Sequence, residues 1–161
     1  MSKKTKCKIP KIVESQTGLL CGKHAINNLL QKKVANCKNL ERIASKISKD
    51  MDIPINELVD TDNGYYDISV LLNFFIKKKK YEVIQIPQSD FHKISYRQSP
   101  RLIGYVFGDG DHWVSLRKTK TKGCYYELDS LKDEPIKIDT VKTWLLENEQ
   151  LLALKILHKK V

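Results

Sequence analysis

Four residues of this chain have side chains that could together hydrolyse an acyl bond: Gln16, Cys21, His112 and Asp129. A cysteine thiolate is a strong nucleophile, an imidazole can take up and return a proton, and a carboxylate can hold the imidazole in one tautomer. An amide N–H group beside the nucleophile can stabilise the oxyanion of a tetrahedral intermediate. These residue types therefore predict a thiol-dependent hydrolase.

Cys21 lies where a loop gives way to a helical pattern. Residues 16–18 are turn-like, and apolar residues then recur at three- and four-residue steps as far as Gln31. At a helix start, unpaired backbone N–H groups and the positive end of the helix dipole lower the pKa of a thiol and favour the thiolate. Most cysteines are small buried hydrophobes, however, and most loop glutamines are simply exposed, so position alone does not decide these roles.

His112 and Asp129 lie at equal distances along the chain from a point between Lys120 and Thr121. A hairpin that turns at that point places the two residues directly opposite each other, with Cβ atoms about 5 Å apart. The carboxylate could then hold one imidazole nitrogen and leave the other for a thiol. A one-residue slip would put them on opposite faces of the sheet, and the alternative interpretation is that both are ordinary polar strand ends.

The elements that must position these residues change in type along the chain. Residues 49–66 are expected to form a short helix with loops, and Asp139 could cap a helix that runs through Asn148. Helical periodicity covers residues 19–31, 39–48 and 67–78, and the last of these has Asp67 as its N-cap and Ile68, Leu71, Leu72, Phe75 and Ile76 as its apolar face. Strand candidates are residues 81–86, 102–107, 112–117, 124–129 and 151–157. Helices followed by mostly sequential strands predict an α+β fold, with a helical N-terminal half and a central antiparallel sheet.

A length of 161 residues fits one domain, with residues 1–8 as a basic flexible tail and residues 9–161 as the folded unit. Apolar residues make up 41% of the chain and charged residues 30%, which excludes a disordered or collagen-like chain. No apolar run approaches the roughly 18 residues that cross a bilayer, and no hydrophobic segment follows the basic N-terminus as in a secretory signal. We therefore expect a monomer that resides in the cytoplasm or the nucleus.

The remaining cysteines and histidines predict no metal site. The four cysteines, Cys7, Cys21, Cys37 and Cys124, form no CxxC pair and are expected to be reduced thiols. His24 shares the helix of Cys21 and is expected to pack and to form hydrogen bonds. A metal site built from Cys21, His24 and His112 would have no recognised spacing, so we expect neither a metal nor another cofactor.

Positive charge dominates the chain, with 29 Lys and Arg against 19 Asp and Glu and a net charge of +10. It gathers in residues 3–11, 77–80 and 117–122. Such patches could bind nucleic acid or an anionic membrane. Lysine outnumbers arginine, which reads bases and phosphates better, and no aromatic residues are interleaved with the patches, so we favour solvated loops and helix ends.

The order of a glutamine, a cysteine at a helix start, and a histidine and an aspartate on successive strands is that of papain-like cysteine hydrolases. Residues 15–31 (SQTGLLCGKHAINNLLQ) resemble the opening motif of the Josephin family of deubiquitinating enzymes, which has a Gln five residues before the Cys, a Cys-x-x-His and an Asn-Asn-Leu-Leu-Gln stretch. Residues 64–68 (GYYDI), 112–113 (HW) and 128–130 (LDS) resemble the later motifs of that family, in order and at similar spacing. The resemblance extends from about Ile9 onward.

The resemblance implies a papain-like α+β fold and a thiol isopeptidase that cleaves at the C-terminal glycine of ubiquitin. It assigns Cys21 as the nucleophile and Gln16 as the oxyanion donor. It also assigns His112 as the general base and then acid, with Asp129 as the residue that orients it. Some members carry Asn in place of Asp129, and a carboxylate there would favour a resting thiolate–imidazolium pair.

The same resemblance implies that ubiquitin or polyubiquitin is the partner. Ile68 and Ser69, at the start of the third expected helix, are candidate contacts with ubiquitin, and Trp113 is a further one. Residues 32–66 would form a movable arm that gates the cleft.

Two other interpretations stay open. A papain-like peptidase that cleaves after Gly-Gly in leader peptides shares the Gln–Cys–His–Asp order, although the Asn-Asn-Leu-Leu-Gln run at residues 27–31 argues against it. A basic module that binds nucleic acid or ubiquitin without cleaving would need none of the four catalytic candidates, so the presence of all four argues against that reading.

Overall fold

The computed structural model describes residues 9–11, 14, 21–60, 65–95, 99–121 and 123–160, and it describes Cys21 by its backbone alone. The expected tail of residues 1–8 lies outside this range. The helices of the described part are α1 (Cys21–Leu30), α2 (Cys37–Met51), α3 (Ile68–Lys77) and α4 (Val141–Glu147), with short 3-10 helices η1 (Ile55–Glu57) and η2 (Gln88–Lys93). The strands are β1 (Val59–Asp60), β2 (Tyr65–Tyr66), β3 (Tyr81–Pro87), β4 (Leu102–Gly108), β5 (Trp113–Lys118), β6 (Tyr125–Leu128), β7 (Ile136–Ile138) and β8 (Leu152–His158).

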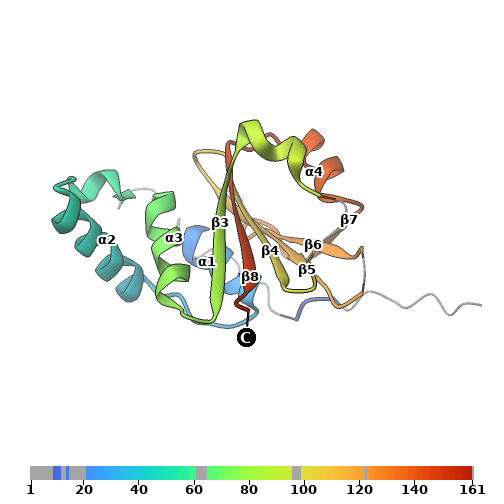
Figure 1. Cartoon of the computed structure of the whole chain (residues 1–161), viewed down its shortest axis with the longest axis horizontal. Helices are drawn as coiled ribbons and strands as arrows, with labels where there is room; N and C mark the ends of the chain where they lie inside the picture. The colour runs from blue at the N-terminus through green and yellow to red at the C-terminus, as the bar shows by residue number, and fades with distance from the viewer. Residues whose placement is uncertain are drawn as a thin grey trace, which may run out of the picture.

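Six strands form one antiparallel sheet in the order β3-β8-β4-β5-β6-β7, and β1 and β2 form a separate hairpin. The predicted α+β fold with a central antiparallel sheet is confirmed (Figure 1). The strands are sequential from β4 to β7. The last strand, β8, breaks this order because it lies between β3 and β4, with Ile156 paired to Val83 and Leu154 paired to Val106.

Both faces of the central strands are buried, because their side chains alternate between two cores. Helices α1, α2 and α3 lie on one side, and α4 lies on the other (Figure 1). In β4, Val106 belongs to the core under α1, whereas the ring of Phe107 lies 5.2 Å from that of Trp144 in α4. The sheet is thus held from both sides, which gives the residues at its edges a fixed support.

Capping side chains set the boundaries of the second and third helices. Asn36 accepts the N–H of Asn39 at 2.8 Å and Asn39 returns the bond at 2.9 Å, which forms a capping box at the start of α2. Asp67 caps α3 as predicted, by accepting the Ser69 N–H at 3.0 Å. The expected apolar face of α3 is partly wrong, because Phe74 is buried whereas Ile76 is 56% exposed.

The fourth helix begins one residue later than predicted. Thr140, and not Asp139, is its N-cap and accepts the Thr143 N–H at 3.0 Å. The physical reason is that Ile138, the last residue of β7, still pairs with Tyr125 of β6. Asp139 is therefore needed to connect the strand to the helix, and the cap falls on the next residue. Strand β7 and the β1–β2 hairpin were not expected, because strands of two or three residues are too short to show a period in the sequence.

Asn27 in α1 is fully buried and ties the loop that follows the helix to the helix itself. Its Oδ1 accepts the N–H groups of Val34 and Ala35 at 2.9 and 2.7 Å. Its Nδ2 donates to the Ala35 carbonyl at 2.9 Å and to Glu14 Oε1 at 3.2 Å. One amide therefore satisfies several polar groups that would otherwise be buried without partners.

Replacing Asn27 by alanine is expected to lower the free energy of unfolding by about 3 kcal/mol, because two backbone N–H groups lose their acceptor. For a domain of this size that loss corresponds to a fall in Tm of roughly 10 °C, measurable by thermal unfolding followed by circular dichroism. The matched variant Asn36→Ala, at the exposed N-cap of α2, should cost about 1 kcal/mol. Equal Tm values for the two variants would contradict the role given to Asn27.

Two cysteines test the expectation of reduced thiols. Cys37, the first residue of α2, is free. Cys124 is disulfide-bonded, so the expectation is wrong for this residue. Disulfide partners are brought together by the fold rather than by their spacing in the sequence, so the lack of a CxxC pair did not exclude a bridge.

Candidate active site

His112 and Asp129 meet at the end of the β5–β6 hairpin. His112 Nε2 lies 2.7 Å from Asp129 Oδ1, within hydrogen-bonding and ion-pairing distance. The two side chains are 20% and 12% exposed, so the pair is sheltered but open to solvent on one side. A carboxylate at Nε2 fixes the ring orientation and directs proton exchange with a thiol to Nδ1.

The hairpin that joins them differs in register from the predicted one. Ser115 pairs with Leu128 and Lys118 with Tyr125, so the continued register places Asp129 opposite Val114 rather than opposite His112. The turn is centred one position later because Gly123, with φ of +79°, lies inside it. His112 lies two residues before Val114, the position opposite Asp129. Its side chain therefore lies on the same face of the sheet as that of Asp129, and the ion pair forms as a diagonal contact.

Groups at the start of the following turn help to keep the Asp129 side chain ionised. Its Oδ1 accepts the Leu131 N–H at 3.0 Å as well as the contact with His112. Burial by itself raises the pKa of Asp129, but the hydrogen bonds from His112 and Leu131, with the charges of His112 and Lys132, outweigh burial and hold the pKa below its usual value. Asp129 is therefore ionised over the whole neutral range.

The loop before β5 fixes His112 from the other side. Asp109 Oδ1 accepts the N–H of Asp111 at 2.9 Å and that of His112 at 2.8 Å. Gly110 between them has φ of +103°, a conformation that glycine adopts readily. This turn was not singled out from the sequence, although Asp-Gly-Asp at residues 109–111 is the signal that could have shown it.

The start of α1 packs beside this pair. A β-carbon added to Gly22 would lie 3.5 Å from Trp113 Cδ1 and 3.2 Å from Tyr66 Cδ2, so the residue after Cys21 lies against the residue after His112. Cys21 is the first residue of α1, at the change from loop to helix that was expected there. The side chain of Cys21 and the whole of Gln16 lie outside the described residues.

A buried cluster holds the chain just before Gln16. Asn28 Oδ1 accepts the Glu14 N–H at 2.6 Å, and Glu14 Oε1 lies 2.8 Å from His24 Nδ1. The prediction that His24 packs and forms hydrogen bonds is confirmed, since it is 3% exposed. Glu14 was missed in the sequence, because only the fold brings it to His24 and Asn28.

The three candidate ubiquitin contacts lie in different settings. Ile68 and Ser69 are the half-buried first residues of α3, and the Ser69 hydroxyl bonds to its N-cap, Asp67. Trp113 is 1% exposed, stacks on Tyr65 at 5.6 Å and donates from its indole N–H to the Tyr66 carbonyl at 2.9 Å. Trp113 is thus a buried packing residue next to His112. A contact of Ile68, Ser69 or Trp113 with ubiquitin stays a prediction.

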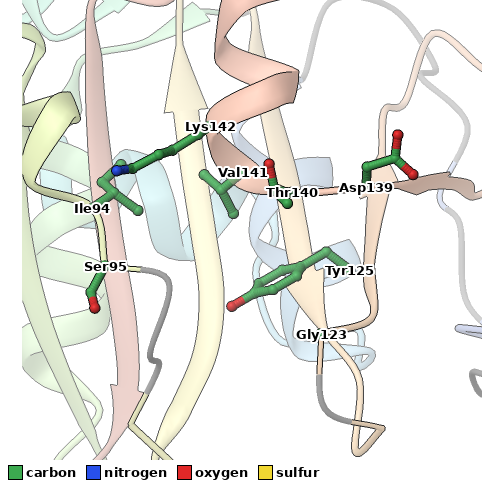
Figure 2. A pocket seen from close by; sticks show the side chains of 8 residues that line it. All are labelled: Ile94, Ser95, Gly123, Tyr125, Asp139, Thr140, Val141 and Lys142. Carbon is green, nitrogen blue, oxygen red and sulfur yellow. The ribbon is translucent and has the colours of Figure 1, made fainter.

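A separate small cavity lies on the α4 side of the sheet (Figure 2). Its volume is about 70 Å³, and the buried hydroxyl of Tyr125, which has no hydrogen-bond partner among the described residues, lies at it. Burial, with Tyr105 nearby, raises the pKa of Tyr125. Neither Cys nor His is among the lining residues, which are Ile94, Ser95, Gly123, Tyr125, Asp139, Thr140, Val141 and Lys142, so this cavity offers no thiol chemistry.

Metal-binding clusters and membrane-spanning helices are both absent from the described part of the chain. No group of three or more His, Cys, Asp or Glu residues there could hold a metal ion. None of its helices combines the length and the apolar character that crossing a bilayer demands.

Comparison with known proteins gives one consistent result. The family model Josephin matches residues 16–152, which contain Cys21, His112 and Asp129. The chain is similar to Josephin-2 of Mus musculus, with 28% identity over 148 residues that cover 82% of this chain and 76% of the relative. It is also similar to Josephin-2 of Homo sapiens, with 28% identity over 130 residues that cover 73% of this chain and 66% of the relative. The fold is accordingly papain-like, and the chain belongs to the Josephin family.

Proposed function

We propose that this protein is a deubiquitinase, a cysteine hydrolase of the (iso)peptide bond at the C-terminal glycine of ubiquitin. Membership in the Josephin family suggests this activity. The observation that carries the proposal is the 2.7 Å contact between His112 and Asp129 beside the first turn of α1. A nucleophile, a base and a group that orients the base are the parts that acyl transfer needs.

In the proposed mechanism the Cys21 thiolate attacks the carbonyl carbon that joins ubiquitin to a lysine amine. The tetrahedral oxyanion accepts hydrogen bonds from the Gln16 side chain and the Cys21 backbone N–H. The imidazolium of His112 gives its proton to the departing amine, which leaves a thioester on Cys21. His112 then takes a proton from water, the resulting hydroxide attacks the thioester, and the Cys21 thiolate departs.

We further propose that residues 9–161 act as one catalytic domain and that residues 32–66 gate its cleft. In Figure 1, α2 lies at the far side of α3 from the sheet. Its buried side chains are Leu40, Ile43 and Ala44, which belong to the core under α1 and α3. Movement of α2 alone, with Tyr65 and Tyr66 still held against Trp113, would leave the sheet and the His112–Asp129 pair in place.

The test is hydrolysis of a fluorogenic amide of ubiquitin by the full chain, run beside the same amides of ubiquitin-like modifiers and of a short peptide that ends in Gly-Gly. We expect cleavage of the ubiquitin amide in preference to all the others. Cleavage of the Gly-Gly peptide at an equal kcat/KM would instead support the leader-type peptidase. Absence of cleavage, with no labelling by a ubiquitin electrophile probe, would contradict the proposal and leave a binding role.

Asp129→Asn is expected to lower kcat/KM roughly tenfold, because the amide oxygen can still accept from Nε2 but no longer stabilises the imidazolium by charge. The alkaline limb of the pH profile should move to lower pH, since the imidazolium then loses its proton more readily. The acid limb should stay where it is, because the lowered pKa of Asp129 keeps it ionised there. Parallel fluorogenic assays from about pH 5 to 10 measure both limbs.

The same carboxylate also links folding to pH. Its pKa in the folded protein lies below the unfolded value of about 3.9, so its contribution to stability is fully present above that value and is lost as the pH falls through the folded-state pKa. The Tm difference between the wild type and Asp129→Asn should therefore narrow in acid and be constant near neutrality. An acid limb that moves with Asp129→Asn would contradict the assignment of a permanently ionised carboxylate.

A further inference from the structure

The end of the sheet opposite the His112–Asp129 pair concentrates positive charge from segments far apart in the sequence. Antiparallel pairing places the start of β3 beside the end of β8, the start of β4 beside the end of β5, and the end of β5 beside the start of β6. The α3–β3 turn and the end of β8 accordingly lie together at the lower edge of the molecule in Figure 1. The cations of residues 77–80 and 117–120, separate in the sequence, thus belong to one edge.

Two hollows open at this edge and share residues 117–120. One has a volume of about 520 Å³ and is lined in addition by Lys32, Tyr81 and His158. The other has a volume of about 390 Å³ and is lined in addition by Lys11 and Gln31. We call the two hollows together the basic groove. Neither an Asp nor a Glu is among the described residues that line it.

Arg117 lines both hollows and is half-buried between them. Its Nη1 donates to the Leu29 carbonyl at the end of α1. Burial lowers the pKa of Arg117, and the nearby Tyr81 opposes that effect. The guanidinium is thus partly removed from water and hydrogen-bonded to a neutral carbonyl.

The described carboxylates do not balance this charge. The ion pair at this edge joins Arg101 to Glu82, at 2.9 Å, outside the groove lining. Lys118 Nζ donates to the Ser99 carbonyl at 3.2 Å, again a neutral acceptor. Arg117 and Lys118 are half-buried, and cations removed from water in folded proteins are normally paired with anions, so the groove around them favours an anionic ligand.

We propose that the basic groove binds a compact polyphosphate, that is, a ligand that carries several phosphate groups close together. Each phosphomonoester brings nearly two negative charges and three acceptor oxygens, which suits the cations of the lining, Lys32 after α1 and Arg117, Lys118 and Lys120 at the end of β5 and in the turn that follows it. Volumes of this size are typical of small-molecule sites. The phosphates could belong to a soluble molecule or to a lipid headgroup, since both present the same chemistry to the groove.

The shape of the groove disfavours the other polyanions. A single-stranded nucleic acid needs a continuous track with aromatic faces for its bases, whereas the aromatic residues of the described lining are Tyr81 and His158, whose rings lie 6.3 Å apart and are tilted by 38° to each other. A membrane that binds by charge alone needs an open convex surface, whereas these cations surround a concavity. A small, highly charged ligand fits both observations.

The groove is also separate from the proposed catalytic site. Lys118 and Trp113 lie at the two ends of β5, which spans about 17 Å at 3.3 Å per residue. Binding in the groove is therefore expected to be independent of Cys21, and its failure would leave the proposed hydrolase untouched.

The experiment is titration calorimetry of the full chain with inositol hexakisphosphate and with tripolyphosphate at about 0.15 M salt, where charges farther apart than about 8 Å are screened. Wild type is expected to bind in a saturable, one-to-one manner. The triple variant Lys32→Gln, Lys118→Gln, Lys120→Gln should weaken binding at least tenfold. The matched variant Lys38→Gln, Lys46→Gln, Lys49→Gln on α2 removes equal charge away from the groove and should change Kd less than twofold.

Two further arms identify the source of the phosphates. Capture by vesicles with phosphatidylinositol 4,5-bisphosphate, but not by phosphatidylserine vesicles of equal charge, supports a headgroup. Binding of the soluble probes without vesicle capture supports a soluble ligand. Equal weakening by the two triple variants, no binding at this salt concentration, or tighter binding of a single-stranded oligonucleotide would each overturn the proposal. Thermal unfolding of each variant, with unchanged Tm, excludes loss of fold as the cause.

Discussion

Replacing Cys21 by alanine is expected to abolish hydrolysis of the ubiquitin amide, with a loss of at least about 10⁴-fold in kcat. The thioester cannot form without the sulfur, and water attack assisted by His112 alone lacks the covalent intermediate that divides the reaction into two easier steps. The measurement is release of the fluorophore at saturating substrate. Labelling by an electrophilic ubiquitin probe, followed by intact mass, should be lost in the same variant.

The chain offers its own control for this experiment. Cys37 is a free cysteine and the first residue of α2, where its side chain bonds to that of Tyr66 and is not among the groups that act on Asp129. Cys37→Ala should keep kcat within about twofold and should still be labelled by the probe. If Cys37→Ala lost activity while Cys21→Ala kept it, the nucleophile would be wrongly assigned.

His112→Ala is expected to lower kcat/KM by about 10³-fold or more, because the variant loses both the base that generates the thiolate and the acid that protonates the amine. The loss should be greatest for an isopeptide, whose amine leaves poorly, and smaller for an activated thioester of ubiquitin, whose leaving group needs no proton. A comparison of the two substrates therefore separates the acid–base role from a purely structural one.

The rate of alkylation of Cys21 is a second test of the role of His112. An ion-paired thiolate reacts with iodoacetamide well below pH 8, so the wild-type rate should persist at pH 6 and the rate in His112→Ala should fall with the thiolate fraction. His92→Ala, an exposed histidine in η2, is the matched control and should change neither rate. Activity of His112→Ala within about tenfold of wild type would show that another group moves the proton.

Much of this arrangement can be read from local patterns. Three kinds of feature depend on residues within a few positions of one another. They are the cap at Asp67, the helix that begins at Cys21, and the five longer strands. The same is true of the hairpin that unites His112 with Asp129. These features were predictable because period and capping are local properties of a chain.

The features that were missed depend on partners far away. Ile76 fits the periodic face of α3, yet Phe74 is buried in its place, because the sheet and not the helix decides which side is covered. The hairpin register depended on whether Gly123 belongs to the turn or to the next strand, which its positive φ decides. The basic groove could not be foreseen, since Lys32, Arg117 and His158 become neighbours only when the sheet is assembled.

The position of β8 has a consequence for how the protein is made. Residues 152–158 are translated after β1 to β7, yet they separate β3 from β4 and pair with both. On the ribosome, those two strands must wait with exposed edges until the final strand emerges, and edges of that kind are where nascent chains aggregate. Folding of the sheet is thus a late, nearly all-at-once event, and a ribosome that stalls before residue 152 leaves a product that chaperones have to hold.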